Sequence, residues 1–174
     1  MIKEPAWIRW LGNVIDWILV VMGGLMVLIT FYNVLSRYIF KADLAWSSEI
    51  VTFMLIWTSF IGGAAAVRRS AHLTVNELIN RFSLKVRYWI DIYIQLVLIG
   101  FIAIMAYFGF QIVAGSMEEL TMALKMPIGT WYAAMPVGAV CSIIFLINNM
   151  YRMISEGKTL AELMIDEHAD KEMI

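Results

Sequence analysis

The sequence predicts an all-α integral membrane protein with four transmembrane helices, both termini in the cytoplasm and a short amphipathic helix at the membrane interface. Three observations lead to this prediction: the composition, four long runs without charge, and an uneven distribution of lysine and arginine. Of the 174 residues, 61% are hydrophobic and 16% are charged. Such a composition is typical of membrane proteins and unusual for soluble domains.

Each of the four uncharged runs is long enough to cross a bilayer, whose hydrocarbon core requires about 20 apolar residues. The runs comprise residues 17–36, 50–67, 92–117 and 126–151. They predict spans over residues 14–37, 47–67, 88–114 and 128–151. We expect these spans to form one membrane domain covering residues 1–174. The first run is too long for the apolar core of a signal peptide, so we expect it to be retained.

Lysine and arginine lie mainly on one side of the predicted membrane. The N-terminus, the middle connection and the C-terminus hold ten of them: Lys3, Arg9, Arg68, Arg69, Arg81, Lys85, Arg87, Arg152, Lys158 and Lys171. The other two connections hold three: Arg37, Lys41 and Lys125. Because the more positive side of a membrane protein faces the cytoplasm, both termini are predicted to be cytoplasmic.

Two connections carry helical signals of their own. Within residues 74–85, the apolar side chains of Val75, Leu78, Ile79 and Phe82 fall on one helical face. This pattern predicts an amphipathic helix lying in the interface. A capping pattern, Ser116-x-x-Glu119, predicts a second short helical segment that ends at Pro127. Pro136 should bend the fourth transmembrane helix, because its ring removes a backbone hydrogen bond.

Motifs for catalysis or cofactor binding are missing from the sequence. The two histidines, His72 and His168, lie outside the predicted spans, where they cannot hold haem within the bundle. Cys141 is the only cysteine, and there is no phosphate-binding loop or nucleophile motif. We therefore expect no enzyme activity and no cofactor. A net charge of −1 without a basic stripe argues against a nucleic-acid partner and leaves membrane lipids as the surroundings.

Polar residues gather where the first two spans meet on the non-cytoplasmic side. Asn33 and Arg37 are four residues apart and hence on one helical face, and Glu49 begins the next span. Pairing would reduce the cost of placing two charges near hydrocarbon. We expect Arg37 and Glu49 to pair, directly or through water, with Asn33 one turn deeper. The alternative is that each side chain reaches water separately.

The second span carries two further patterns. A stripe at helical spacing, comprising Trp46, Glu49, Phe53, Trp57, Phe60 and Ala64, is interpreted as a packing face rather than a ligand site. Gly62 and Gly63 predict close approach of another helix backbone. No charge lies near the middle of any span, where a transporter needs polar groups. This absence favours a companion subunit over a transport pathway.

These motifs together resemble a known family. The order Asn33-x3-Arg37, Trp46-x2-Glu49, Trp57 with Phe60-x-Gly62-x-Ala64, and Arg69-x2-His72 is similar to that of the small membrane subunit, of DctQ type, of tripartite ATP-independent periplasmic (TRAP) transporters. Pro127-x-Gly129, Trp131-Tyr132 and Pro136-x-Gly138 fit the same family's fourth helix. The likeness runs from Gly12 to Arg152. Asn76 departs from it, since relatives are expected to carry an acid there.

The resemblance implies a place in a sodium-coupled importer of the bacterial inner membrane. The partners would be a large membrane subunit of DctM type, which moves the substrate, and a periplasmic binding protein of DctP type. The substrate would be an organic acid, either a sialic acid or a C4-dicarboxylate. This chain would act as a scaffold, with Arg37, Trp46 and Glu49 ordering the first hairpin. The rival reading is a homo-oligomeric four-helix exporter, which would carry a membrane-embedded glutamate in its first helix, whereas this helix has only Asp16.

Overall fold

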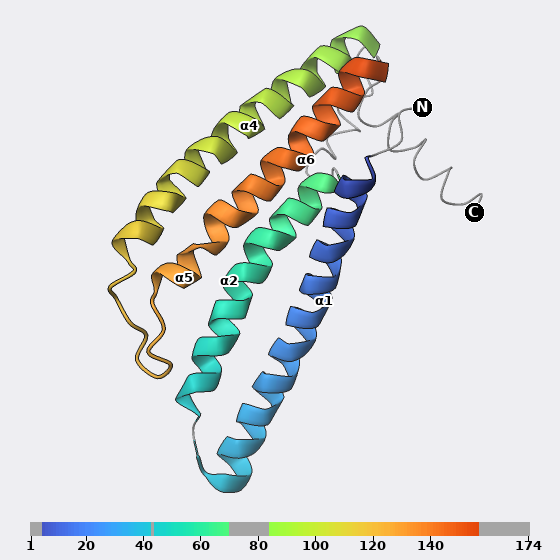
Figure 1. Cartoon of the computed structure of the whole chain (residues 1–174). Coiled ribbons are helices and arrows are strands. Elements are labelled where there is room, and N and C mark those ends of the chain that lie inside the picture. Colours follow the sequence, from blue (N-terminus) through green and yellow to red (C-terminus); the bar gives the residue numbers. More distant parts are fainter. Residues whose placement is uncertain (1–4, 43, 70–83, 157–174) are drawn as a thin grey trace, which may run out of the picture.

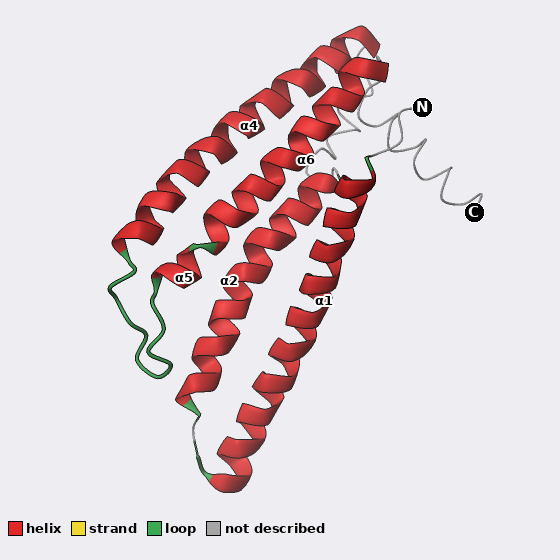
Figure 2. Ribbon diagram, in the orientation of Figure 1, coloured by secondary structure: helices red, strands yellow, loops and turns green. Residues whose placement is uncertain are grey.

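The computed structural model describes residues 5–42, 44–69 and 84–156. Four long helices account for most of these residues: α1 (Ala6–Leu35), α2 (Ala45–Arg68), α4 (Leu84–Gly115) and α6 (Ala134–Glu156). A π-helix, η1 (Ser36–Phe40), continues α1, and a short helix, α5 (Gly129–Tyr132), precedes α6. Helices and loops make up the described chain (Figure 2). Within the described residues, four spans are long and apolar enough to cross a membrane, which confirms the predicted all-α membrane fold with four transmembrane helices. The orientation of the termini stays a prediction.

The long helices lie side by side in the order α1, α2, α6, α4 (Figure 1). In this arrangement α2 packs between α1 and α6, and α6 packs between α2 and α4. In the most apolar windows of α1 and α4, only 6% of residues are buried, against 39% in the span that contains α6. The described chain is therefore an open layer with α1 and α4 at its edges, and both edges present apolar surface.

The largest apolar core lies at the end of the layer where α1 begins and α2 ends. Its buried members come from three helices: Ile8, Ile15, Ile61, Ala64, Ala65, Val67, Phe145 and Leu146. Small side chains on α2 let its neighbours approach closely on both sides. Partly buried side chains of α4 complete this core.

The first helix begins at Ala6, earlier than the predicted boundary at residue 14. Ile8, Gly12 and Ile15 are buried and follow one another at spacings of four and three residues, so they form one face of α1. The helix continues past the uncharged run because this face still packs on its neighbours. Helix α4 likewise begins at Leu84 rather than at residue 88. The interfacial helix predicted over residues 74–85 falls mostly on residues 70–83, outside the described chain, and stays a prediction.

The fourth span is broken rather than gently bent. Helices α5 and α6 are separated at Ala133, three residues before Pro136. Pro136 thus occupies the first turn of α6, where a missing backbone N–H costs no helical hydrogen bond. The break bears out the disturbance expected from Pro136, and the fourth apolar span of the described chain, Gly129–Ser155, lies close to the predicted residues 128–151.

The helical segment predicted after Ser116 is also wrong, because residues 119–128 form a tight hairpin. Its backbone is paired by the hydrogen bonds from Thr121 N to Met126 O (2.9 Å) and from Ile128 N to Glu119 O (2.8 Å). Lys125 adopts a left-handed backbone with φ of 54°. Because these backbone groups form hydrogen bonds across the hairpin, they do not form helical hydrogen bonds. The described residues 116–128 therefore contain no helix after the capping pattern at Ser116.

Candidate functional site

The carboxylate of Glu49 fastens the hairpin of residues 119–128 to the start of α2. Its two oxygens accept hydrogen bonds from successive backbone amides, one from Ala123 N at 2.7 Å and one from Leu124 N at 2.9 Å. Hydrogen bonds to an ionised acceptor are shorter and stronger than those between neutral groups. Glu49 therefore links α2 to a loop 74 residues further along the chain.

Glu49 was expected to pair with Arg37, directly or through water; its described partners are backbone amides instead of a direct Arg37 contact, and a pairing through water stays a prediction. Among the described residues, the hydrogen-bond partners of the Glu49 carboxylate are the amides of the hairpin. Arg37 lies in η1, the π-helix that continues α1. Backbone amides have no side-chain signature, so the sequence pattern could not indicate these partners of Glu49.

The connection between η1 and α2 is ordered by other side chains. The Asn33 side-chain oxygen accepts a hydrogen bond from Leu44 N at 3.4 Å. Ser47 is buried and its hydroxyl donates to Leu44 O at 2.7 Å. Lys41, with φ of 53°, ends η1 in a left-handed conformation. Trp46 is exposed at the start of α2.

Aromatic contacts continue the attachment of α2 deeper into the layer. The Phe53 ring lies 5.9 Å from that of Trp57 and 6.1 Å, edge to face, from that of Trp131. The Trp57 indole N–H donates to Thr130 O at 3.3 Å. Helix α5 is thus held against α2 by the stripe that the sequence suggested as a packing face. Such aromatic pairs add to the stability gained from burial alone.

Close approach of two backbones occurs at Gly138, not at the glycines singled out in α2. A Cβ at Gly138 would lie 2.8 Å from Phe60 O, so α6 can pack on α2 only with glycine there. A Cβ at Gly62 would meet Leu19 at 3.9 Å, an ordinary contact, and one at Gly63 would meet nothing within 4 Å. The signal in the sequence was the Pro136-x-Gly138 motif, which marks both the helix break and this contact.

A second polar contact joins α1 and α2 at the opposite end of the layer. Asp16 pairs with Arg69 at 2.7 Å, between Oδ1 and Nη2, and lies 3.6 Å from the Arg68 guanidinium. A side chain at Gly12 would overlap the Arg68 guanidinium, so glycine leaves room for it. Asp16 is evident in the sequence as the acidic residue of the first helix, but its contact with Arg69 was not predicted. The sequence feature that could have indicated it is the acidic Asp16 near the start of the first span and the basic Arg68 and Arg69 at the end of the second.

Helix α4 is joined to α6 by a buried polar contact. The Gln95 side-chain amide, which is fully buried, donates to the Met153 sulfur at 2.8 Å. Asp91, Asn148 and Asn149 are also buried near this end of the two helices. A sulfur is a weak acceptor, but an amide in an apolar setting gains from any partner.

The described side chains are arranged for holding helices together. Their interhelical hydrogen bonds and ion pairs lie toward the ends of the layer at Glu49, Asn33, Asp16 and Gln95, and in the middle of α2 the Trp57 indole donates to Thr130. Within residues 5–42, 44–69 and 84–156, no group of three metal-ligating His, Cys, Asp or Glu side chains comes together. The candidate site is therefore a contact surface.

An open layer of membrane-spanning helices, fastened at both ends, defines a multi-pass membrane protein. Residues 26–156, about three quarters of the chain, match the family described as "Tripartite ATP-independent periplasmic transporters, DctQ component". The chain belongs to this family, as the resemblance had indicated.

Three curated relatives are similar to parts of the chain. The C4-dicarboxylate TRAP transporter small permease protein DctQ of Vibrio cholerae is 33% identical over 81 residues, which is 44% of this chain and 35% of that protein. The sialic acid TRAP transporter permease protein SiaT of Haemophilus influenzae is 24% identical over 152 residues, 87% of this chain and 23% of SiaT. A putative TRAP transporter small permease protein of Haemophilus influenzae is 33% identical over 58 residues, 33% of this chain and 36% of that protein. The matched segments thus span about a third or less of each relative.

Proposed function

We propose that this chain is the small permease subunit of a sodium-coupled TRAP transporter in the bacterial inner membrane, with both termini in the cytoplasm. Its role is that of a scaffold: it stabilises a large membrane subunit of DctM type, which carries the substrate. It also helps to dock a periplasmic binding protein of DctP type. The imported substrate is an organic acid, a sialic acid or a C4-dicarboxylate, the two classes that occur in the names of the relatives.

The construction of the helix layer carries this proposal. Its edge helices are almost unburied within the chain, and the interhelical contacts of its charged side chains Glu49 and Asp16 lie toward the ends. A transport pathway needs polar groups near the midplane, whereas a scaffold needs a rigid shape and apolar surface for its partner. The similarity to SiaT supports the partner: a segment related to nearly the whole chain occupies under a quarter of that permease.

Reconstitution tests the proposal directly. Liposomes containing this chain alone, the large subunit alone, or both are supplied with binding protein, a sodium gradient and labelled sialic acid or C4-dicarboxylate. Uptake is expected only when both membrane subunits are present, and it should collapse when sodium is replaced by potassium. Uptake by this chain alone above empty liposomes would refute the scaffold role. Full uptake by the large subunit alone would show that this chain is not needed for transport.

A further inference from the structure

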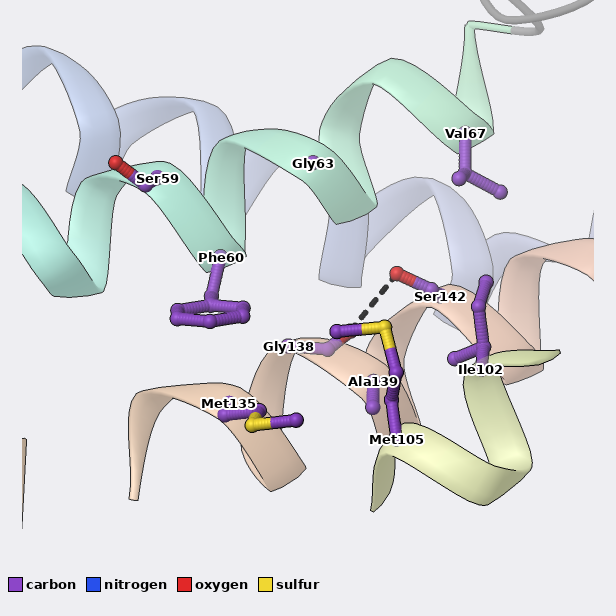
Figure 3. A pocket seen from close by; sticks show the side chains of 10 residues that line it. All are labelled: Ser59, Phe60, Gly63, Val67, Ile102, Met105, Met135, Gly138, Ala139 and Ser142. Atoms are coloured by element: carbon purple, nitrogen blue, oxygen red, sulfur yellow. Dashed lines mark hydrogen bonds between the residues drawn. The ribbon is translucent and has the colours of Figure 1, made fainter. Parts of the chain in front are cut away.

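The layer carries a hollow on its surface between α2 and α4, with α6 as its floor. It has a volume of about 170 Å³, close to the ~150 Å³ of an apolar cavity that holds benzene. Figure 3 shows α2 contributing Ser59 and Gly63, α4 contributing Ile102, and α6 contributing Ala139 and Ser142. All of these residues belong to membrane-spanning segments, so whatever fills the hollow lies within the membrane.

The two hydroxyl groups in the lining require no outside partner. Ser59 donates to Leu55 O and Ser142 donates to Gly138 O, each at 2.8 Å (Figure 3 draws the second bond). Serine in a helix commonly bonds in this way to the carbonyl four residues earlier. The lining is otherwise apolar and the hollow opens to the surface, so its occupant is a hydrocarbon group that needs no hydrogen bond.

The glycine at position 63 has no explanation within the described chain. A Cβ there would meet nothing within 4 Å, whereas one at Gly138, across the hollow, would strike the α2 backbone. Glycine in a helix interior costs roughly 0.5–1 kcal/mol relative to alanine. Small residues on facing membrane helices let a third helix approach the backbone closely. A lipid chain, which adapts its shape, has no such requirement.

We propose that this hollow receives a large apolar side chain from a transmembrane helix of the large membrane subunit. The inference rests on the proposed function, which supplies the partner, and it deepens that function by naming the contact face. The partner helix crosses the open face of the layer over Gly63 and Ala139, with a leucine or phenylalanine inserted between α2 and α4. This contact holds the large subunit to the middle of the layer.

Filling the hollow from this chain's own side tests the contact. Gly63→Phe places a ring in the hollow, and Gly100→Phe is the matched control, because a Cβ at Gly100 also meets nothing within 4 Å and Gly100 does not line the hollow. Both subunits are co-expressed, solubilised in mild detergent and purified through a tag on this chain. Gly63→Phe is expected to lower the recovered large subunit by about tenfold, and Gly100→Phe is expected to leave it unchanged. Equal recovery with Gly63→Phe and wild type, or equal loss with both variants, would overturn the inference.

A crosslinking experiment avoids filling the hollow and so keeps the test independent of folding defects in the Gly63→Phe variant. A photo-reactive phenylalanine analogue replaces Phe60, which lines the hollow, or Phe110, which is exposed on α4 and does not line it, in the complete system, and membranes are irradiated before solubilisation. An adduct with the mass of both subunits is expected from position 60 only. Adducts with lipid alone, or with a second copy of this chain, would assign a different occupant and overturn the inference. If wild-type chain fails to retain the large subunit at all, the proposed function itself fails, which is a distinguishable result.

Discussion

Glu49, in the first turns of α2, accepts a hydrogen bond of 2.7 Å from the backbone N–H of Ala123, 74 residues later in the chain. The second oxygen of the same carboxylate accepts from the neighbouring amide of Leu124. The Glu49 side chain thus connects the start of α2 to the loop between α4 and α5. Because the partners of Glu49 are backbone amides, mutation of Glu49 is expected to affect the hairpin of residues 119–128.

Glu49→Gln should loosen the hairpin of residues 119–128. The amide keeps one oxygen acceptor but turns an NH₂ group toward a backbone N–H, so one of the two bonds is lost. We expect the melting temperature of the detergent-solubilised subunit to fall by about 2–4 °C, with faster proteolysis within residues 119–128. Glu118→Gln is the control, since Glu118 is exposed in the same loop. Equal cleavage rates for Glu49→Gln and wild type would contradict the assigned contact.

Arg37→Ala and Glu49→Ala should act additively. The Glu49 partners are amides of residues 123 and 124, and effects at sites that do not share a contact usually add. The decrease in melting temperature of the double variant should therefore equal the sum of the two single decreases. A double-mutant cycle on the purified complex measures this, and a clearly smaller decrease in the double variant would support the pairing, direct or through water, expected from the sequence.

Gly138→Ala should destabilise the packing of α2 on α6. Its Cβ would lie 2.8 Å from a backbone oxygen of α2, which cannot turn aside as a flexible side chain can. Overpacking of this kind costs about 1–3 kcal/mol. Gly63→Ala is the matched control on the facing helix and should be neutral or slightly stabilising, because its Cβ meets open space. Thermal unfolding in detergent compares the two, and a Gly138→Ala protein as stable as wild type would be inconsistent with this packing.

Asp16→Asn should weaken the attachment of α1 to α2 by a modest amount. The Asp16–Arg69 pair is partly exposed, with 33% and 64% of the two side chains accessible, so solvent screens it. Pairs of this kind contribute about 0.2–1 kcal/mol, and added salt reduces the contribution. The difference in melting temperature between variant and wild type should shrink as the salt concentration rises. Arg9→Gln, which removes an exposed charge on the same helix, should show no such convergence.

Fusions to the C-terminus test the predicted topology. Ten of the thirteen lysine and arginine residues lie in segments assigned to the cytoplasmic side, which predicts that both ends of the chain are cytoplasmic. Alkaline phosphatase fused after Ile174 should be inactive, and a fluorescent protein fused at the same place should fluoresce. A phosphatase fusion at Lys125 should be active. The reverse pattern would invert the orientation.

Several contacts could have been anticipated from sequence, and others could not. The stripe through Phe53 and Trp57 lies against α5. Its aromatic residues follow one another at helical spacing, so they form one face of α2, and such a face is expected to pack against a neighbouring helix. The glycines at which two backbones approach closely were harder to choose. Gly62 and Gly63 have the small-residue spacing expected for helix contact, but the close approaches occur at Gly138 and Gly129, and only the position of the neighbouring backbone decides this.

The sequence by itself determined the four membrane-spanning helices, since the bilayer demands about 20 apolar residues per span and the chain interrupts its apolar runs with charge. The tertiary structure decided the lateral order α1, α2, α6, α4 and the partner of Glu49. In hydrocarbon, a side chain that faces lipid is as apolar as one that faces another helix, so hydropathy does not reveal which faces meet. Every residue except proline offers the same backbone N–H, so only the fold could bring those of Ala123 and Leu124 to a carboxylate in α2.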